Sequence, residues 1–358
     1  MNVSLKVLVL TKILHFYYGS AFGCRLQRAV QNDLDMGFEC TVYVWSDAET
    51  DEFWIPGADE VSVAYFKRNR RLAYLFPALN DFLGLKRVFK GFKCDLVHAH
   101  NLECAFYAFE IGLPVVFDDW EFHWIYYKFA REVSFNRLSL PLRWYRNTAA
   151  KPILRSMFET VPFIVTNSAV AEEYERMGVE SVGVVPNVPL QFERDYAFAV
   201  DVPKREKISS CYVGKLTRDS QTIMRNTSGL AELWKKHDLG DLYAFEGQNY
   251  CNHLDVLRSI RSFHFNLLYW KPIEVHKYYL QNKAFLASAV GVPTIITSSL
   301  SSTINLLGEY ALVVGKLEEI PNIIKDYDYS KKYSLREDHL WEFYESAIKK
   351  AYNKVNAK

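Results

Sequence analysis

The chain has 358 residues, enough for two domains at the usual size of roughly 100–200 residues each. Its 43 lysines and arginines nearly balance 42 aspartates and glutamates, so the net charge is +1. This balance excludes a uniformly basic nucleic-acid-binding chain and an acidic disordered one. The aromatic fraction of 15% is high. No apolar run reaches the roughly 18 residues that a transmembrane helix needs. We also expect no signal peptide, because the apolar run near the start is too short.

Predicted strands and helices alternate along the first half of the chain. Residues 6–10 form an apolar run that predicts a buried first strand, and residues 22–36 have helical spacing that ends at Gly37. Further strands are expected at residues 41–45, 95–99, 114–117, 163–166 and 182–185. Short apolar strands separated by helices favour a parallel sheet that is covered on both faces, the doubly wound α/β class.

The same alternation restarts after a polar stretch, residues 194–207, which predicts a linker. Strands are expected beyond it at residues 210–213, 242–245, 265–268, 293–297 and 312–314. Helices are expected at residues 229–236, 282–290 and, as a charged amphipathic end, 338–355. The sequence therefore predicts two α/β halves of similar size.

Common cofactor and metal motifs are missing from the sequence. Only Gly19 and Gly23 follow the first predicted strand, without the G-x-G-x-x-G spacing, and Gly214-Lys215 lacks the Ser or Thr of a P-loop. We interpret Asp33-Leu34-Asp35 as a solvated helix surface. Six cysteines without a C-x-x-C pair predict neither a zinc site nor a disulfide framework, and favour a cytoplasmic location. We therefore expect no metal and no cofactor.

Five segments in chain order carry a resemblance to a known family. They read D-L-V-H-A-H-N at 95–101, I-V-T-N-S with A-E-E-Y and G-V within 164–179, V-V-P-N at 184–187, Y-V-G-K-L at 212–216, and Q-N-K through A-V-G-V-P within 281–293. Together they resemble glycosyltransferase family 4. The resemblance implies the GT-B fold: two Rossmann-like domains that face each other across a cleft, with a C-terminal helix near the interface.

The same resemblance divides the chain into three parts. Residues 1–190 would form the acceptor-side domain, residues 191–335 the donor domain, and residues 336–358 a helix that returns to the N-terminal domain. The implied activity transfers a sugar from a nucleotide-diphosphate sugar to a hydroxyl of a lipid-linked or glycan acceptor, with retention and without a metal. The nucleotide sugar is then a substrate, not a cofactor.

Candidate site residues follow predicted strands, where ligands of open α/β sheets bind. Cations and helix N-termini stabilise a leaving diphosphate, so the expected donor-binding residues are Gly214, Lys215, Arg218, Asn282 and Lys283. The sugar and acceptor side is expected to include Gly19, Arg25, His100 and Asn101. His98, which alternates inward on its strand, is interpreted as a core residue.

Catalytic candidates follow the strand predicted at 114–117. They are Asp118, Asp119, Glu121 and His123. Three carboxylates within four residues repel one another, so we expect one to have a raised pKa and to serve in acid–base chemistry. The alternative is that Asp119 caps a helix.

Two positions depart from the family pattern. Leu286 stands where the family's donor-binding Glu is expected, with Tyr278 at its paired acidic position, and Trp120 stands at the position of a His near the reacting sugar. A leucine side chain accepts no hydrogen bond from a ribose hydroxyl. A catalytically inactive nucleotide- or carbohydrate-binding protein and a GT-B sugar-nucleotide epimerase therefore stay as alternatives.

Residues 65–93 combine eight basic residues and one acidic residue with seven aromatic rings, and a second basic band spans residues 137–155. Such segments bind anionic membranes, and lipid-linked acceptors would lie at that surface. A solvated helix face with buried rings is the main alternative, and nucleic acid is the least favoured partner. We therefore expect a cytoplasmic protein that attaches peripherally to the inner face of a membrane.

Overall fold

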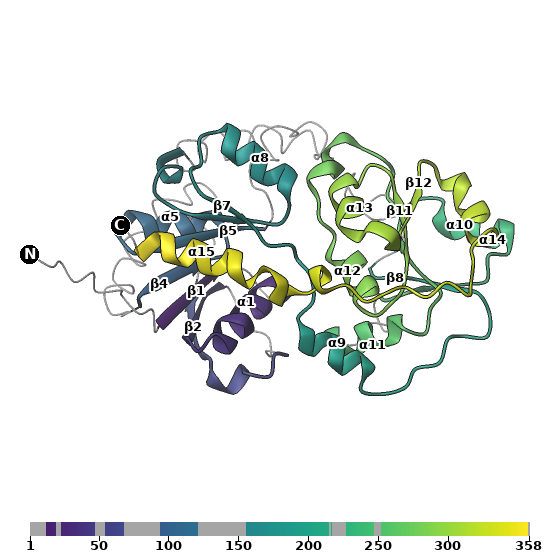
Figure 1. The fold of residues 1–358 in the computed structure, drawn as a ribbon, viewed down its shortest axis with the longest axis horizontal. Helices are drawn as coiled ribbons and strands as arrows, with labels where there is room; N and C mark the ends of the chain where they lie inside the picture. Colours follow the sequence, from purple (N-terminus) through teal and green to yellow (C-terminus); the bar gives the residue numbers. More distant parts are fainter. Residues whose placement is uncertain are drawn as a thin grey trace, which may run out of the picture.

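The computed structural model describes residues 12–18, 23–46, 54–67, 94–120, 155–214, 216, 227–246 and 252–356. Within these ranges the chain forms two lobes side by side, each built on a parallel sheet with helices on its faces (Figure 1). The predicted doubly wound α/β class is confirmed. The strand predicted at residues 6–10 lies outside the described residues, and the first described strand is β1 (Lys12–Tyr18).

The N-terminal sheet has the strand order β3-β2-β1-β4-β5-β6-β7, with every neighbouring pair parallel. Its further strands are β2 (Glu39–Ser46), β3 (Ser62–Lys67), β4 (Leu96–Ala99), β5 (Val115–Asp119), β6 (Phe163–Val165) and β7 (Val182–Val184). Its helices are α1 (Cys24–Asp35), α5 (Leu102–Glu110) and α8 (Ser168–Arg176). The strands expected at residues 41–45, 95–99, 114–117, 163–166 and 182–185 and the expected first helix are confirmed within a few residues, whereas β1 and β3 were not expected.

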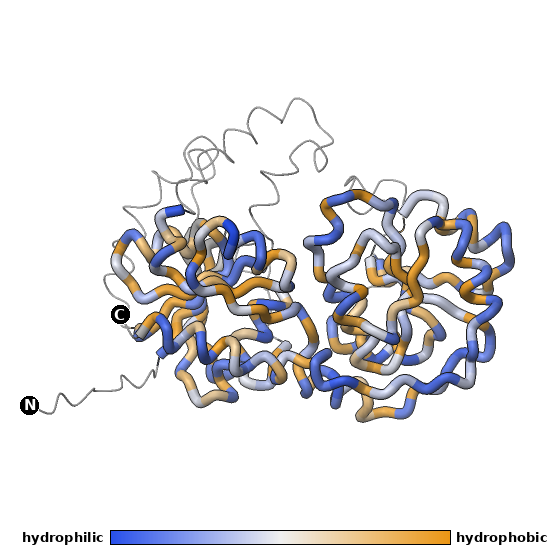
Figure 2. Tube along the Cα trace, turned by 45° about the horizontal axis from the view of Figure 1, so that its top comes forward, coloured by the Kyte–Doolittle hydropathy of each residue, from blue (hydrophilic) through white to orange (hydrophobic). Residues whose placement is uncertain are grey.

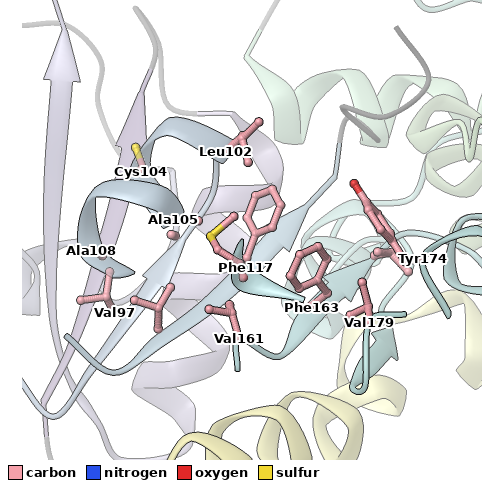
Figure 3. Packing of buried hydrophobic residues seen from close by; sticks show 14 of the residues in the cluster. Val97, Leu102, Cys104, Ala105, Ala108, Phe117, Val161, Phe163, Tyr174 and Val179 are labelled. Atoms are coloured by element: carbon pink, nitrogen blue, oxygen red, sulfur yellow. The ribbon is translucent and has the colours of Figure 1, made fainter. Parts of the chain in front are cut away.

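Alternation along the strands separates two faces of this sheet. One face, which α5 and α8 cover, packs Val97, Phe117 and Phe163 against Leu102 and Tyr174 (Figure 3). Each fully buried ring of this kind contributes about 1.5–3 kcal/mol to folding. The opposite face lies under α1 and the C-terminal helix, and it carries the polar residues described below.

The C-terminal sheet has the order β12-β11-β10-β8-β9 and is again parallel throughout. Its strands are β8 (Ser209–Tyr212), β9 (Asp241–Ala244), β10 (Phe265–Leu268), β11 (Thr294–Thr297) and β12 (Ala311–Val314). Its helices are α9 (Gln191–Phe198), α10 (Leu230–His237), α11 (His253–Ile260), α12 (Asn282–Ala289), α13 (Ser301–Leu307) and α14 (Ile320–Lys325). Apolar segments run through the interior of both lobes (Figure 2).

Short 3₁₀ turns complete the described elements. They are η1 (Ala58–Glu60), η5 (Glu274–Tyr278), η6 (Gly308–Tyr310), η7 (Leu317–Glu319), η8 (Glu337–His339) and η9 (Trp341–Tyr344). Because η8 and η9 occupy the start of the helix expected at 338–355, the C-terminal helix α15 begins later and spans Glu345–Asn356.

The C-terminal helix crosses back to the N-terminal sheet (Figure 1). Ile348 and Tyr352 of α15 pack with Ile13, Val116 and Ile164 on the face that α1 also covers. This burial joins the end of the chain to the middle of the first sheet.

The linker predicted at 194–207 is partly wrong, because its first residues belong to α9. Glu193 is fully buried, accepts a hydrogen bond from the Leu190 amide and pairs with Arg28. Ala197 packs into an apolar cluster of the C-terminal domain. These contacts hold a helix in a stretch whose polar composition suggested none.

Candidate functional site

Helix α1 places two buried arginines where the domains meet. Arg25 binds Asp118 of β5 through both oxygens, at 2.7 Å from Nη2 to Oδ1 and from Nε to Oδ2, and donates to the Val185 carbonyl at 2.9 Å. Burial alone would raise the pKa of Asp118, but Arg25 and then His100 and His98 outweigh it and hold that pKa well below its usual range. The expectation of a raised carboxyl pKa is therefore wrong for Asp118.

Three histidines lie beside this ion pair at the centre of the sheet. His15 of β1 pairs in register with His98 of β4, and His100 follows the end of β4. Their rings stack, with the His98 and His100 centroids 4.4 Å apart. His15 Nδ1 lies 3.1 Å from His100 Nε2, and all three side chains are at most 1% exposed. The expectation that His98 is a core residue is confirmed.

Asp33 of α1 completes this group from the opposite side. Its Oδ2 lies 3.2 Å from His15 Nε2 and accepts a hydrogen bond of 2.7 Å from the Tyr352 hydroxyl. The same hydroxyl lies 2.8 Å from His98 Nδ1. The interpretation of Asp33 as a solvated residue is wrong, because α1 turns it toward the sheet and it is fully buried.

The charges in this group balance one another. Burial alone would raise the pKa of Asp33, but the hydrogen bonds and charges of His15 and His98 outweigh burial and lower it to about 2. Burial also disfavours the charge on His98, but Asp118 and Asp33 outweigh it and raise the pKa of His98. Burial and the nearby His98 lower the pKa of His100 to about 3. Two carboxylates thus face Arg25 and His98, whose raised pKa favours its protonated form. We call these groups, with His15, His100 and Tyr352, the histidine network.

Within the described part of the chain, the three histidines of the histidine network are the group of side chains whose spacing could hold a metal ion. One nitrogen from each of His15, His98 and His100 lies within 4.8 Å of the others. However, the rings of His98 and His100 are stacked with planes 16° apart, and those of His15 and His100 with planes 19° apart. The lone pair of an imidazole nitrogen lies in the plane of its ring, so near-parallel planes disfavour one shared ion, whereas the rings of His15 and His98 are tilted by 33°. A metal-free protein stays a prediction.

The remaining described candidates of this domain point elsewhere. Asp119 alternates to the other face of β5, where its carboxylate accepts a hydrogen bond from the Tyr174 hydroxyl. Asn101 is the buried N-cap residue of α5. Trp120 donates from its indole nitrogen to the His100 carbonyl at 2.7 Å. The residue at the family's His position therefore fixes the backbone of His100.

The donor candidates of the second domain meet at the end of β8. Gly214 has a backbone φ of +132°, a conformation that residues other than glycine rarely adopt. A Cβ atom added there would lie 2.7 Å from Lys283 Nζ. Lys283 stands in the first turn of α12, whose N-terminus carries a partial positive charge. The structure thus brings Gly214, Asn282 and Lys283 together, and we call them the donor group.

Arg28 connects the donor group to α1. Its Nη1 donates to Asn282 Oδ1 and to Asn187 Oδ1, both at 2.9 Å. Its other nitrogens bind Glu193 at 2.7 and 2.8 Å. Since Arg25 lies one turn away on the same helix, α1 links the histidine network to the donor group.

A second contact joins the domains through α8 and η5. Asn167 donates to the Tyr278 carbonyl at 2.9 Å, and the Tyr278 hydroxyl donates to Glu173 at 2.7 Å. Tyr278, at the family's acidic position, therefore binds the N-terminal domain. Leu286, at the family's Glu position, is 3% exposed and packs in an apolar cluster.

Several sequence candidates lie outside the described residues. They are Gly19, Glu121, His123, Lys215 and Arg218, together with residues 68–93 and 137–154 of the basic stretches. Sequence reasoning missed His15, Arg28 and Glu193. The local signal for His15 is a histidine within an apolar strand, Lys12–Tyr18. A first strand expected at residues 6–10 leaves His15 outside it, so this signal does not single it out.

Comparison with known proteins supports the architecture. Protein-family models give no match, and curated protein sequences give none. Among solved structures, sucrose-phosphate synthase from Thermosynechococcus elongatus is similar at 13% identity and TM-score 0.62, over 97% of this chain and 99% of that one. Anabaena Alr3699/HepE in complex with UDP and glucose is similar at 12% identity and TM-score 0.60, over 95% and 98%.

An E. coli trehalose-6-phosphate structure bound with UDP-2-fluoro glucose matches 97% of both chains at 9% identity and TM-score 0.59. At these identities the likeness concerns the fold. It covers nearly the whole of each chain. The chain therefore has the two-domain GT-B fold.

Proposed function

We propose that this chain is a glycosyltransferase, similar to family 4, that moves a sugar from a nucleotide-diphosphate sugar to an acceptor hydroxyl. The observation that carries the proposal is that the Lys283 ammonium, at the start of α12, occupies the space next to the strand-end Gly214 where a side chain would lie. A cation and a helix N-terminus at the end of a parallel strand are suited to a diphosphate. Similar folds hold UDP with glucose or UDP-2-fluoro glucose, which supports a nucleotide-sugar donor.

The donor and acceptor roles are divided between the domains in this proposal. Residues 191–335 hold the donor, with Lys283, Lys215 and Arg218 neutralising the diphosphate as it leaves. Residues 1–190 hold the acceptor, with direct sugar contact assigned to Asn101, Glu121 and His123. Asp118 and His100 are enclosed, so they act by holding Arg25 and the end of β4 in place.

We propose transfer with retention, as the resemblance to family 4 implies, and transfer without a metal. Lysines and helix N–H groups supply the positive charge that a metal would otherwise bring to the diphosphate. We therefore expect turnover to persist in excess EDTA. Loss of turnover with EDTA and its return with Mn²⁺ would contradict this part of the proposal.

A nucleotide-binding protein without transferase activity is the second candidate, and buried Leu286 favours it. Leucine cannot replace a carboxylate that holds a ribose hydroxyl. Release of nucleoside diphosphate from UDP-, GDP- and ADP-sugars would separate the two. Turnover of one donor supports the transferase, whereas tight nucleotide binding without release supports the binding protein, and conversion of one sugar nucleotide to its epimer would show an epimerase.

The acceptor is proposed to be a lipid-linked or glycan hydroxyl at an anionic membrane surface. The positive charge of residues 65–93 supports this. Separately, none of the described helices has the length and apolar character to cross a bilayer. Replacing Lys67, Arg68, Arg70 and Arg71 by Ser should release the protein from anionic liposomes at low salt. Equal sedimentation of both proteins with liposomes would contradict attachment through this stretch.

A further inference from the structure

A cysteine, a histidine and a glutamate form a row where the two domains meet. Cys24, the first residue of α1, is partly exposed, and its Sγ lies 3.6 Å from Nδ1 of His253 in α11. The other ring nitrogen, Nε2, lies 2.6 Å from Glu193 Oε1 in α9. A thiol and a carboxylate thus face the two nitrogens of one imidazole.

The surroundings hold this imidazole in one orientation. The ring of Trp54 lies over His253 with centroids 4.7 Å apart. Arg28 binds Glu193 through two nitrogens, and although burial opposes the charge, Arg28 and His253 lower the pKa of Glu193 to about 2. The carboxylate that orients the ring is therefore ionised at neutral pH.

The surroundings of the pair favour opposite charges on its two members. Burial disfavours a charged His253, but Cys24 and Glu193 outweigh burial and raise the pKa of His253 to about 9. Burial likewise opposes a thiolate, but His253 and then Arg28 outweigh it and lower the pKa of Cys24. The position of Cys24 at a helix N-terminus further favours the anion.

We propose that Cys24 is a covalent modification site for small, uncharged, soft electrophiles. The sulfur attacks the electrophilic carbon, so an S–C bond forms while the bond to the leaving group breaks and that group departs with its electron pair. His253 takes the thiol proton before the attack, so the sulfur reacts as a thiolate and the proton stays on the imidazole. The product is a neutral thioether, which removes one of the two anionic partners of His253 and weakens the link between α1 and α11.

The chain supplies a comparison within one molecule. Cys94 is also partly exposed, but burial and the neighbouring Asp95 raise the pKa of its thiol to about 11. With limiting iodoacetamide at pH 7, peptide mass analysis of the full chain should show Cys24 alkylated at least tenfold faster than Cys94. Equal or slower alkylation of Cys24 would overturn the proposal.

Replacing the histidine tests the cause of this reactivity. His253→Gln should slow alkylation of Cys24 at least fivefold, whereas His237→Gln, at an exposed histidine of the same domain, should leave it unchanged. An unchanged rate in His253→Gln would overturn the assignment to the pair.

The wild-type pH profile decides the matter if His253→Gln does not fold. An ordinary thiol with a pKa of about 8.5 would react roughly 25-fold faster at pH 9 than at pH 7. The rate at Cys24 should rise less than fivefold over this range. A rise of fivefold or more would overturn the proposal.

Discussion

The two sheets use the ends of their strands in different ways. In the N-terminal domain, Asp118 and His100 stand at strand ends yet are buried within a network that neutralises its own charges. In the C-terminal domain, the strand-end Gly214 meets the ammonium of Lys283, and both residues are only partly buried. The strand-end position is therefore shared, but it is the second group that we propose as the anion site.

The largest effect should come from breaking the ion pair of the histidine network. Arg25→Ala leaves the Asp118 carboxylate buried without its guanidinium, and such losses cost about 3–5 kcal/mol. The exposed pair of Lys12 and Glu39, at 2.7 Å, is the control, and Lys12→Ala should cost less than about 1 kcal/mol. Urea unfolding measures both, and equal costs would refute the contrast between enclosed and exposed charges.

A substitution in the donor group should lower the affinity for UDP and leave the stability of the protein unchanged. Lys283→Met keeps the length of the side chain but removes the charge, so the affinity for UDP should fall about 10- to 100-fold, as for a lost charged hydrogen bond. Lys277→Met, at an exposed lysine paired with Glu274, is the control and should bind normally. Calorimetric titration checks this, and unchanged affinity in Lys283→Met would remove Lys283 from the donor site.

The Tyr352 hydroxyl should contribute less than the ion pair does. Tyr352→Phe leaves the buried Asp33 without one donor, which should lower the free energy of unfolding by about 2 kcal/mol. Tyr329→Phe removes a more exposed hydroxyl that donates to the Ile324 carbonyl, and should cost less than about 1 kcal/mol. An unchanged free energy of unfolding in Tyr352→Phe would show that α15 is held by packing alone.

Acid should weaken the histidine network gradually. His100 stays neutral in the folded protein because burial lowers its pKa to about 3, whereas in the unfolded chain it gains a proton below about pH 6.5. The unfolded state therefore binds more protons, and the free energy of unfolding should fall by about 1.4 kcal/mol for each pH unit below 6.5. His15, whose pKa is also lowered by burial, acts in the same direction.

Chemical denaturation at pH 7, 6 and 5 measures this dependence. His100→Gln should show a shallower decline, because it removes one of the groups whose protonation differs between the two states. Stability that is level from pH 7 to pH 5 would contradict neutral, buried histidines.

Local patterns predicted the fold, and partly the site. Alternating apolar strands and helices predict two parallel sheets. The charge of Asp33 suggests a solvated position, although Asp33 lies three residues after the buried Val30 and four after Ala29. That helical spacing alone places it on the apolar side of α1. The polar composition of residues 194–207 predicts a linker, but residues 194–198 belong to α9, which Arg28 holds through Glu193 from 165 residues away.

The donor group was easier to predict than the interdomain contacts. A strand followed by glycine and a helix with a lysine in its first turn are signals within short segments, so Gly214 and Lys283 could be named from the sequence. The row of Cys24, His253 and Glu193 joins segments up to 229 residues apart, and no local pattern marks it.

A crystal structure with UDP soaked in the presence of EDTA tests the central claim most directly. The proposal predicts a diphosphate within about 3 Å of Lys283 Nζ and beside the backbone of Gly214, with no metal between phosphate and protein. Nucleotide bound at another place, or none at a saturating concentration, would contradict a donor site at the end of β8.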